Sequence, residues 1–278
     1  AFIMKKENIK KVVLAYSGGL DTSIIIPWLK ENYNNCEVVA VSGDVGQGTE
    51  LDGLEERAIS CGASKLYILD VNDELCDEYI VPCVQAHAVY ENKYLLGTSM
   101  ARPLIAKKLV EVARKEGATA ICHGATGKGN DQIRFDMTFL VMAPGVEIIT
   151  LTRDNNLSRQ EEVDFLNKHG FYADFTKLKY SYNVGIWGTS ICGGEILDSK
   201  QGLPESAYLK HPTKTGTELL RIGFKKGEIS SVNGVEYDDK IKAIQKIEEI
   251  GAAYAIGRDC HVGDTIIGIK GRVGFEAA

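Results

Sequence analysis

Residues 12–23, Val-Val-Leu-Ala-Tyr-Ser-Gly-Gly-Leu-Asp-Thr-Ser, are the stretch that decides the fold. The apolar residues 12–15 predict a buried strand, which ends before Gly18 and Gly19, and a helical pattern begins at Thr22. A strand that turns through glycines into a helix directs several backbone N–H groups and the positive helix end at one point. Because glycine has no Cβ, a ligand can approach this backbone closely. The stretch therefore predicts a phosphate site, although an ordinary capped strand-to-helix turn is the alternative.

No Gly-Lys-Ser or Gly-Lys-Thr follows the glycine pair, so the loop is not a Walker A loop. The composition is that of a folded globular protein, with 44% hydrophobic and 25% charged residues among 278. The net charge of −6 argues against nucleic acid as a partner. Seven cysteines without a Cys-x-x-Cys pair indicate reduced thiols rather than disulfides or zinc. With no signal pattern and no apolar run of about 18 residues, we expect a cytoplasmic protein without a membrane partner.

Strand-like and helix-like segments alternate through the first half of the chain. The predicted strands cover residues 12–16, 38–42, 65–70, 120–123 and 148–151, and the predicted helices cover 22–31, 51–61, 73–89 and 100–116. This alternation predicts an α/β fold, a doubly wound parallel sheet with helices on both faces. Ligands of such sheets bind beyond the carboxyl ends of the strands, where both glycine-rich stretches of this chain begin.

The chain changes character after Gly170, where the strand–helix alternation stops. We therefore expect a first domain over residues 1–170 and a second, α+β domain over 171–278. In the second domain, the pattern predicts a hairpin of residues 219–224 and 228–232 and an amphipathic helix over 238–251. Alternating residues at 265–270 and 273–275 predict two further strands.

A second glycine-rich stretch runs from His123 through Gly-Ala-Thr-Gly-Lys-Gly-Asn to Asp131. Three glycines within six residues after a strand indicate close backbone approach to a ligand. Lys128 and Arg134 add cationic donors, and an arginine can hold a carboxylate or phosphate through two hydrogen bonds. A glycine loop with a capping aspartate is the structural alternative. A third stretch, residues 94–103, places Thr98 or Ser99 as a helix cap, which capping alone can explain.

Together, the stretches at residues 12–23, 94–103 and 123–134 resemble the argininosuccinate synthase family. The first alone resembles the pyrophosphate loop of the N-type ATP pyrophosphatases, which cleave ATP to AMP and pyrophosphate. The similarity is dense from Lys11 to Pro144 and thinner beyond. It implies a nucleotide-binding domain followed by a synthetase domain. It also implies a ligase of arginine biosynthesis that uses ATP and Mg²⁺ to join citrulline to aspartate through a citrullyl-adenylate.

The resemblance also implies a role for individual residues. Positions that match the ATP site are Ala15, Tyr16, Ser17, Gly18, Gly19, Leu20, Asp21, Thr22, Ser23, Gly43 and Gly124. The aspartate positions are Thr126, Asn130 and Asp131, and the citrulline positions are Tyr94, Ser99, Asn130, Arg134, Ser181 and Ser190. Asp21 is the candidate for holding Mg²⁺, and Asp131 for orienting the incoming amine; we take both as catalytic candidates.

The second half departs from the family pattern. Thr150-Leu-Thr-Arg153 stands where Ala-Pro-Trp-Arg is usual. Gly263 and Phe275 stand where a glutamate and a tyrosine contact citrulline, and Asp264 is the candidate substitute for the glutamate. Family members continue past Ala278 into a helix that locks a homotetramer. We therefore expect the second domain to be incomplete at its end.

Two other functions are compatible with the first loop. One is another N-type ATP pyrophosphatase, such as a tRNA-thiolating enzyme, for which paired reactive cysteines and a basic surface are expected. The sequence has neither. The other is a non-catalytic ATP-binding sensor, which Gly263 and Phe275 favour because they remove two expected citrulline contacts.

Overall fold

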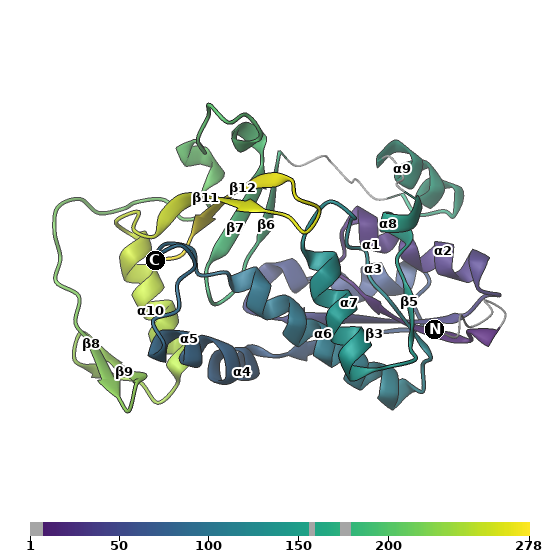
Figure 1. Ribbon diagram of the computed structural model, residues 1–278, viewed down its shortest axis with the longest axis horizontal. Helices are drawn as coiled ribbons and strands as arrows, with labels where there is room; N and C mark the ends of the chain where they lie inside the picture. Colours follow the sequence, from purple (N-terminus) through teal and green to yellow (C-terminus); the bar gives the residue numbers. More distant parts are fainter. Residues whose placement is uncertain (1–7, 156–158, 173–178) are drawn as a thin grey trace. The chain divides into compact units, whose positions relative to one another are not determined.

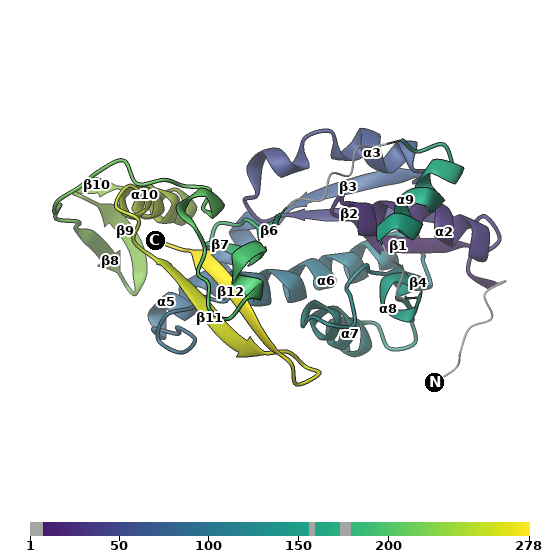
Figure 2. The same cartoon turned by 90° about the horizontal axis from the view of Figure 1, so that it is seen from above.

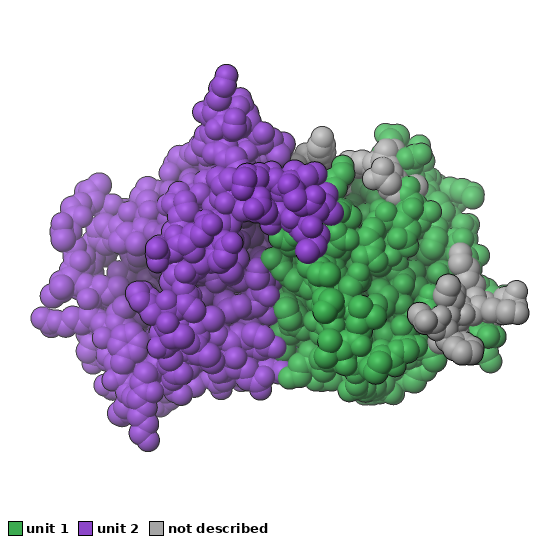
Figure 3. All heavy atoms as spheres, viewed as in Figure 1, with its two compact units in different colours: residues 1–44, 48–70, 102–177 green, residues 45–47, 71–101, 178–278 purple. Residues whose placement is uncertain are grey.

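In the computed structural model, which describes residues 8–155, 159–172 and 179–278, the chain forms two compact units (Figure 3). The first unit takes residues 1–44, 48–70 and 102–177, and the second takes 45–47, 71–101 and 178–278. The division at residue 171 stays a prediction, but the second unit also draws in residues from the first half of the sequence. Among the described helices, none has the length and apolar character needed to span a membrane.

A five-stranded parallel sheet forms the centre of the first unit (Figure 1). Its strands lie in the order β3-β2-β1-β4-β5. Their bounds are β1 Lys11–Ala15, β2 Glu37–Asp44, β3 Lys65–Asp70, β4 Ala120–Cys122 and β5 Glu147–Ile149. Leu14 of β1 pairs with Ala40 on one side and with Cys122 on the other. The strand order therefore reverses beside β1, and the carboxyl ends of β1 and β4 are neighbours.

Helices cover both faces of this sheet, which confirms the predicted doubly wound α/β fold. Val12 and Leu14 face a core shared with α1 Leu20–Ser23, α2 Ile25–Asn32, α3 Leu54–Ser60 and α9 Arg159–Lys168. Gly43 of β2 faces the other way, since a Cβ there would lie 2.8 Å from Ile105 Cγ1 of α6 Gly97–Glu116. Alternate strand residues are thus buried on opposite faces, as expected for a parallel sheet covered on both sides.

The four predicted helices of the first half differ from the structure in their bounds. The helix expected at 22–31 begins earlier, as α1 followed by α2, and Pro27 lies in the first turn of α2, where a missing N–H costs no hydrogen bond. The helical region expected from residue 73 towards residue 89 is confirmed as far as Gln85. It consists of α4 Asn72–Leu75, a π-helical turn at Cys76–Ile80 and α5 Val81–Gln85, which follow one another directly. Pro82 lies at the start of α5, where proline is tolerated.

The second unit contains two antiparallel sheets, in the orders β11-β12-β7-β6 and β10-β9-β8. The strands of the first are β6 Tyr180–Asn183, β7 Thr189–Gly193, β11 Arg258–Asp264 and β12 Lys270–Glu276. Those of the second are β8 Ile222–Lys225, β9 Glu228–Val232 and β10 Val235–Glu236. The predicted hairpin is confirmed in β8 and β9, and the predicted helix is α10 Lys240–Ala252, which lies beside β9 (Figure 2).

The strand predicted over residues 265–270 is wrong. Residues 265–269 form the turn between β11 and β12, closed by a hydrogen bond from Thr265 N to Ile269 O of 2.9 Å. Gly268 has a φ of +78°, which favours glycine and suits a tight turn. The isoleucines that suggested a strand are exposed at the tip of this turn.

Candidate functional site

The first glycine loop joins β1 to α1, and side chains of α3 contact it. Gly18 has a φ of +78°, and a Cβ added there would lie 2.4 Å from Leu54 Cδ1. Arg57 Nη1 donates a hydrogen bond of 2.9 Å to Gly18 O. Only glycine therefore fits at position 18, and Arg57, which the sequence did not single out, fixes the carbonyl of the loop.

Hydroxyl groups bridge the loop and the first helical turn. Ser17 Oγ lies 3.2 Å from Thr22 Oγ1, which also donates to Gly19 O at 3.2 Å. Tyr16 OH and Ser23 Oγ lie 3.2 Å apart in the core, where burial raises the pKa of Tyr16. Leu20 is buried as well.

The loop therefore has a core side and a solvent side. The side chains of three predicted ATP residues, Tyr16, Leu20 and Ser23, belong to the core, and only their backbone can face a ligand. Ser17, Gly19 and Asp21 are exposed to solvent. The N–H groups of the first helical turn have no partner within the helix, so they are available to an anion.

The second glycine-rich stretch meets the first at the neighbouring strand. Gly124 follows β4, and a Cβ there would lie 3.2 Å from both Thr22 Cγ2 and Ile25 Cδ1. Gly43 lies near the carboxyl end of β2, on the other side of β1. The predicted ATP residues of the two neighbouring strands thus flank the first loop, because β2, β1 and β4 are adjacent and parallel.

A helix that the sequence analysis did not predict begins at Asp131. This helix, α7 Asp131–Met142, follows Asn130 directly. The carboxylate of Asp131 accepts hydrogen bonds from Arg134 Nη1 at 2.6 Å and from Arg102 Nε at 3.1 Å. The aspartate candidates Asn130 and Asp131 and the citrulline candidate Arg134 therefore lie together. Arg102 completes the cluster and was missed, although it lies within the third stretch that the sequence singled out.

In the second unit, Tyr94 and Ser190 line one pocket together with Phe275. The ring of Tyr94 stacks between His261, with centroids 5.0 Å apart, and Phe275, with centroids 5.1 Å apart. Ser190 pairs with Phe275 across β7 and β12, and its Oγ lies 3.3 Å from Thr98 Oγ1. Ser190, expected to contact citrulline, is thus placed beside one of the two positions that depart from the family pattern.

The other departure, Gly263, lies on β11. A Cβ at Gly263 would lie 2.5 Å from His261 Nε2, so a glutamate there would require the imidazole to move. The candidate substitute Asp264 is exposed, and its carboxylate accepts a hydrogen bond of 2.9 Å from Lys270. The two remaining citrulline candidates are Ser99, in the first turn of α6, and Ser181, opposite Cys192 in β6 and β7.

The predicted residues are thus divided between the units. All ATP and aspartate candidates lie in the first unit, together with Arg134. Tyr94, Ser99, Ser181 and Ser190 lie in the second. Among the described residues, no group of three or more His, Cys, Asp or Glu side chains gathers as a metal site.

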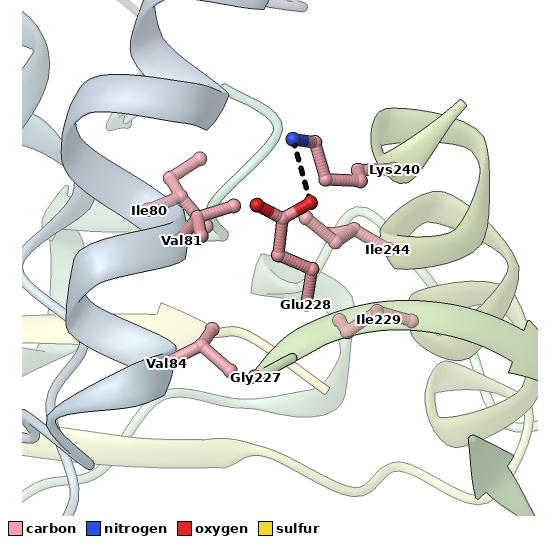
Figure 4. A pocket seen from close by; sticks show the side chains of 8 residues that line it. All are labelled: Ile80, Val81, Val84, Gly227, Glu228, Ile229, Lys240 and Ile244. Carbon is pink, nitrogen blue, oxygen red and sulfur yellow. Dashed lines mark hydrogen bonds and ion pairs between the residues drawn. The ribbon is translucent and has the colours of Figure 1, made fainter. Parts of the chain in front are cut away.

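A different pocket of the second unit contains none of the predicted residues. Figure 4 shows its lining of apolar side chains from the π-helical turn, α5, β9 and α10, with Lys240 donating to Glu228 at 3.1 Å. Lys240 Nζ also lies 2.7 Å from Asp77 Oδ1, and these two partners raise the pKa of the lysine. The lysine charge is therefore already paired with carboxylates of the protein.

Comparison with known proteins matches two consecutive segments of the chain to one family. The model of the arginosuccinate synthase N-terminal HUP domain matches residues 11–172, and that of the arginosuccinate synthase C-terminal domain matches residues 180–278. The argininosuccinate synthase of Lachnospira eligens is 52% identical over 96% of this chain and 67% of its own length. The argininosuccinate synthase of Carboxydothermus hydrogenoformans is 49% identical over 96% of this chain and 68% of its own length.

Among solved structures, an NH3-dependent NAD synthetase from Campylobacter jejuni matches with a TM-score of 0.41 and 15% identity, over 63% of this chain and 71% of that chain. The family assignment depends instead on the two domain models and on the sequence relatives, which cover nearly the whole chain. The predicted resemblance is confirmed: the chain belongs to the argininosuccinate synthase family.

Proposed function

We propose that this chain condenses citrulline with aspartate, using ATP, to give argininosuccinate, AMP and pyrophosphate. The observation that carries the proposal is the meeting of two glycine loops at the carboxyl ends of β1 and β4, within a chain of this family. One loop offers exposed backbone N–H groups to phosphates. The other, next to it, leads into the Asp131 cluster, which is suited to amino-acid substrates.

In the proposed site, residues 15–23 hold ATP, with Ser17 and Gly19 beside the pyrophosphate and Gly43 and Gly124 on the adenosine side. Asp21 would hold Mg²⁺. When bound, this ion supplies positive charge that neutralises phosphate oxygens. The chain contributes fixed N–H donors, which need no reorganisation as negative charge moves onto the leaving pyrophosphate.

The two amino acids react in sequence. The ureido oxygen of citrulline attacks the α-phosphorus of ATP, and pyrophosphate leaves. The aspartate amine then attacks the ureido carbon, and AMP leaves. Thr126, Asn130 and Asp131 would hold aspartate. Because the Asp131 carboxylate already accepts from Arg102 and Arg134, it is fixed in position and can orient the incoming amine by accepting its N–H.

A coupled pyrophosphate assay tests the proposed function. Steady-state pyrophosphate release from ATP and Mg²⁺ should require both citrulline and aspartate, and omitting either should remove it. Release supported by tRNA in place of citrulline would favour the tRNA-thiolating alternative. ATP binding without pyrophosphate release under any of these conditions would favour the sensor. The homotetramer and the cytoplasmic location stay predictions.

Arg134→Ala should raise the KM for citrulline at least about tenfold or abolish activity. A charge-assisted hydrogen bond to a substrate carboxylate contributes about 1.5–3 kcal/mol, and about 1.4 kcal/mol corresponds to tenfold. The substitution also frees one oxygen of Asp131. The measurement is initial rate against citrulline at saturating ATP and aspartate. Arg221→Ala, an exposed arginine of the second unit, is the control. Wild-type citrulline kinetics in Arg134→Ala would refute the assignment.

A further inference from the structure

A chain of buried and half-buried polar side chains lies beneath the second glycine loop. His123 is fully buried, and its Nδ1 accepts a hydrogen bond of 3.2 Å from the N–H of Ala125. Its other nitrogen, Nε2, therefore carries the proton and donates to Asp136 Oδ1 at 2.8 Å. One end of the loop is thus tied to α7 through an imidazole in a defined tautomer.

The chain continues from Asp136 to Arg153 on α8 Leu151–Asn155. Arg153 Nη1 donates to Asp136 Oδ2 at 2.6 Å and to Gln132 Oε1 at 3.2 Å. Burial acts to raise the pKa of Asp136, but hydrogen bonds from His123 and Arg153 lower it by more, so the carboxyl stays ionised and holds the guanidinium. Arg153 Nη2 donates to Thr150 Oγ1 at 3.2 Å. The guanidinium of Arg153 is therefore held by three acceptor side chains.

The last member of the chain, Gln132, holds the loop itself. Its Nε2 donates to Gly127 O at 2.9 Å and to Gly129 O at 3.2 Å. Since Arg153 donates to the amide oxygen, it sets which way the Gln132 amide points and so directs the NH₂ group at the two carbonyls. A segment with three glycines loses much conformational freedom on ordering and makes no side-chain contacts at those positions. It depends on such external hydrogen bonds for a defined shape.

We propose that Gln132 and Arg153 are positioning residues for aspartate: by holding the carbonyls of Gly127 and Gly129, they keep Thr126 and Asn130 in the arrangement that binds this substrate. The proposal rests on the proposed function and deepens it. It gives a role to Arg153 in the segment where Thr150-Leu-Thr-Arg153 replaces Ala-Pro-Trp-Arg.

Gln132→Glu tests the proposal, because the change retains the shape and length of the side chain. The glutamate can still accept from Arg153, but it cannot donate to the two glycine carbonyls and repels their oxygens. We expect the KM for aspartate to rise roughly tenfold or more, since small displacements of binding groups have large kinetic effects. The KM for ATP should stay within about twofold, and the KM for citrulline should rise less than that for aspartate, because the two amino acids share only the candidate contact Asn130. Gln245→Glu, the same change on the exposed side of α10, should leave all three unchanged.

Arg153→Lys is the second variant and decides the question if Gln132→Glu does not fold. Lysine keeps a charge beside Asp136 but lacks the planar fork that reaches Gln132 and Thr150 together. Arg153→Lys should raise the KM for aspartate more than those for citrulline and ATP, and by a smaller factor than Gln132→Glu does. An unchanged KM for aspartate in both variants, or an equal rise for all three substrates, would overturn the proposal. Absence of argininosuccinate formation by the wild-type protein would instead refute the proposed function.

Discussion

Gly19→Ala should leave the fold intact and remove most of the pyrophosphate release. Gly19 has φ −75° and ψ 171°, a conformation open to alanine, and an added Cβ would meet only Ser17 Oγ, at 3.7 Å. The fold of the free protein therefore does not require glycine here. A phosphate lying against this exposed backbone does, because a methyl group would displace it. We expect kcat/KM for ATP to fall about a hundredfold, because misplacement of reacting groups typically lowers rates by about this factor.

The measurement is the rate of pyrophosphate release against ATP, together with the free energy of unfolding. Alanine is a weaker N-cap than glycine but restricts the unfolded chain, so the free energy of unfolding should change by less than about 1 kcal/mol. Gly202→Ala, at an exposed glycine without positive φ and with nothing within 4 Å of an added Cβ, is the matched control. Wild-type ATP kinetics in Gly19→Ala would mean that the phosphates lie elsewhere.

The parts of the site that the sequence predicted are those that local patterns encode. An apolar run followed by glycines marks a buried strand that ends in a ligand loop, and both such loops lie where strand alternation places them. The strand–glycine–helix pattern also predicts that position 18 needs glycine, but it does not show which residues would clash with a larger side chain. Leu54 and Arg57 approach Gly18 from a helix more than thirty residues away, and no local pattern announces such a contact.

The parts that were missed depend on contacts between distant segments. The hydrogen bonds of Arg102, Gln132 and Arg153 at the second loop form only because α6, α7 and α8 bring these side chains to it. The sequence does not mark the start of α7 clearly, because Asn130 and Asp131 are as typical of the end of a glycine loop as of the start of a helix. Its later residues Phe135 and Phe139, four apart and both buried, were the available signal of a helix. The isoleucines at 266 and 267 led instead to a wrongly predicted strand, because they are exposed in a turn and an apolar pattern does not guarantee burial.

Asp21→Asn should reduce kcat by about a hundredfold or more and raise the Mg²⁺ concentration needed for half-maximal rate. The change keeps the size of the side chain and removes the negative charge that a hard cation requires. Asp21 is exposed in the first turn of α1, so the change costs only the small attraction between a carboxylate and the helix N-terminus, less than about 1 kcal/mol. The measurement is pyrophosphate release during a Mg²⁺ titration at fixed ATP.

The Mg²⁺ dependence separates a metal ligand from a residue with another role. If Asp21 holds the ion, excess Mg²⁺ should recover part of the rate in Asp21→Asn, because the phosphates of ATP still bind the ion and only one ligand is weakened. Asp238→Asn, an exposed aspartate of the second unit, should show the wild-type titration. A lower kcat with an unchanged Mg²⁺ midpoint would remove Asp21 from the metal site but leave it beside the phosphates. An unchanged kcat would remove Asp21 from the active site. Asp21 is the only carboxylate among residues 15–23, so no neighbour in the loop could take over its role in the variant.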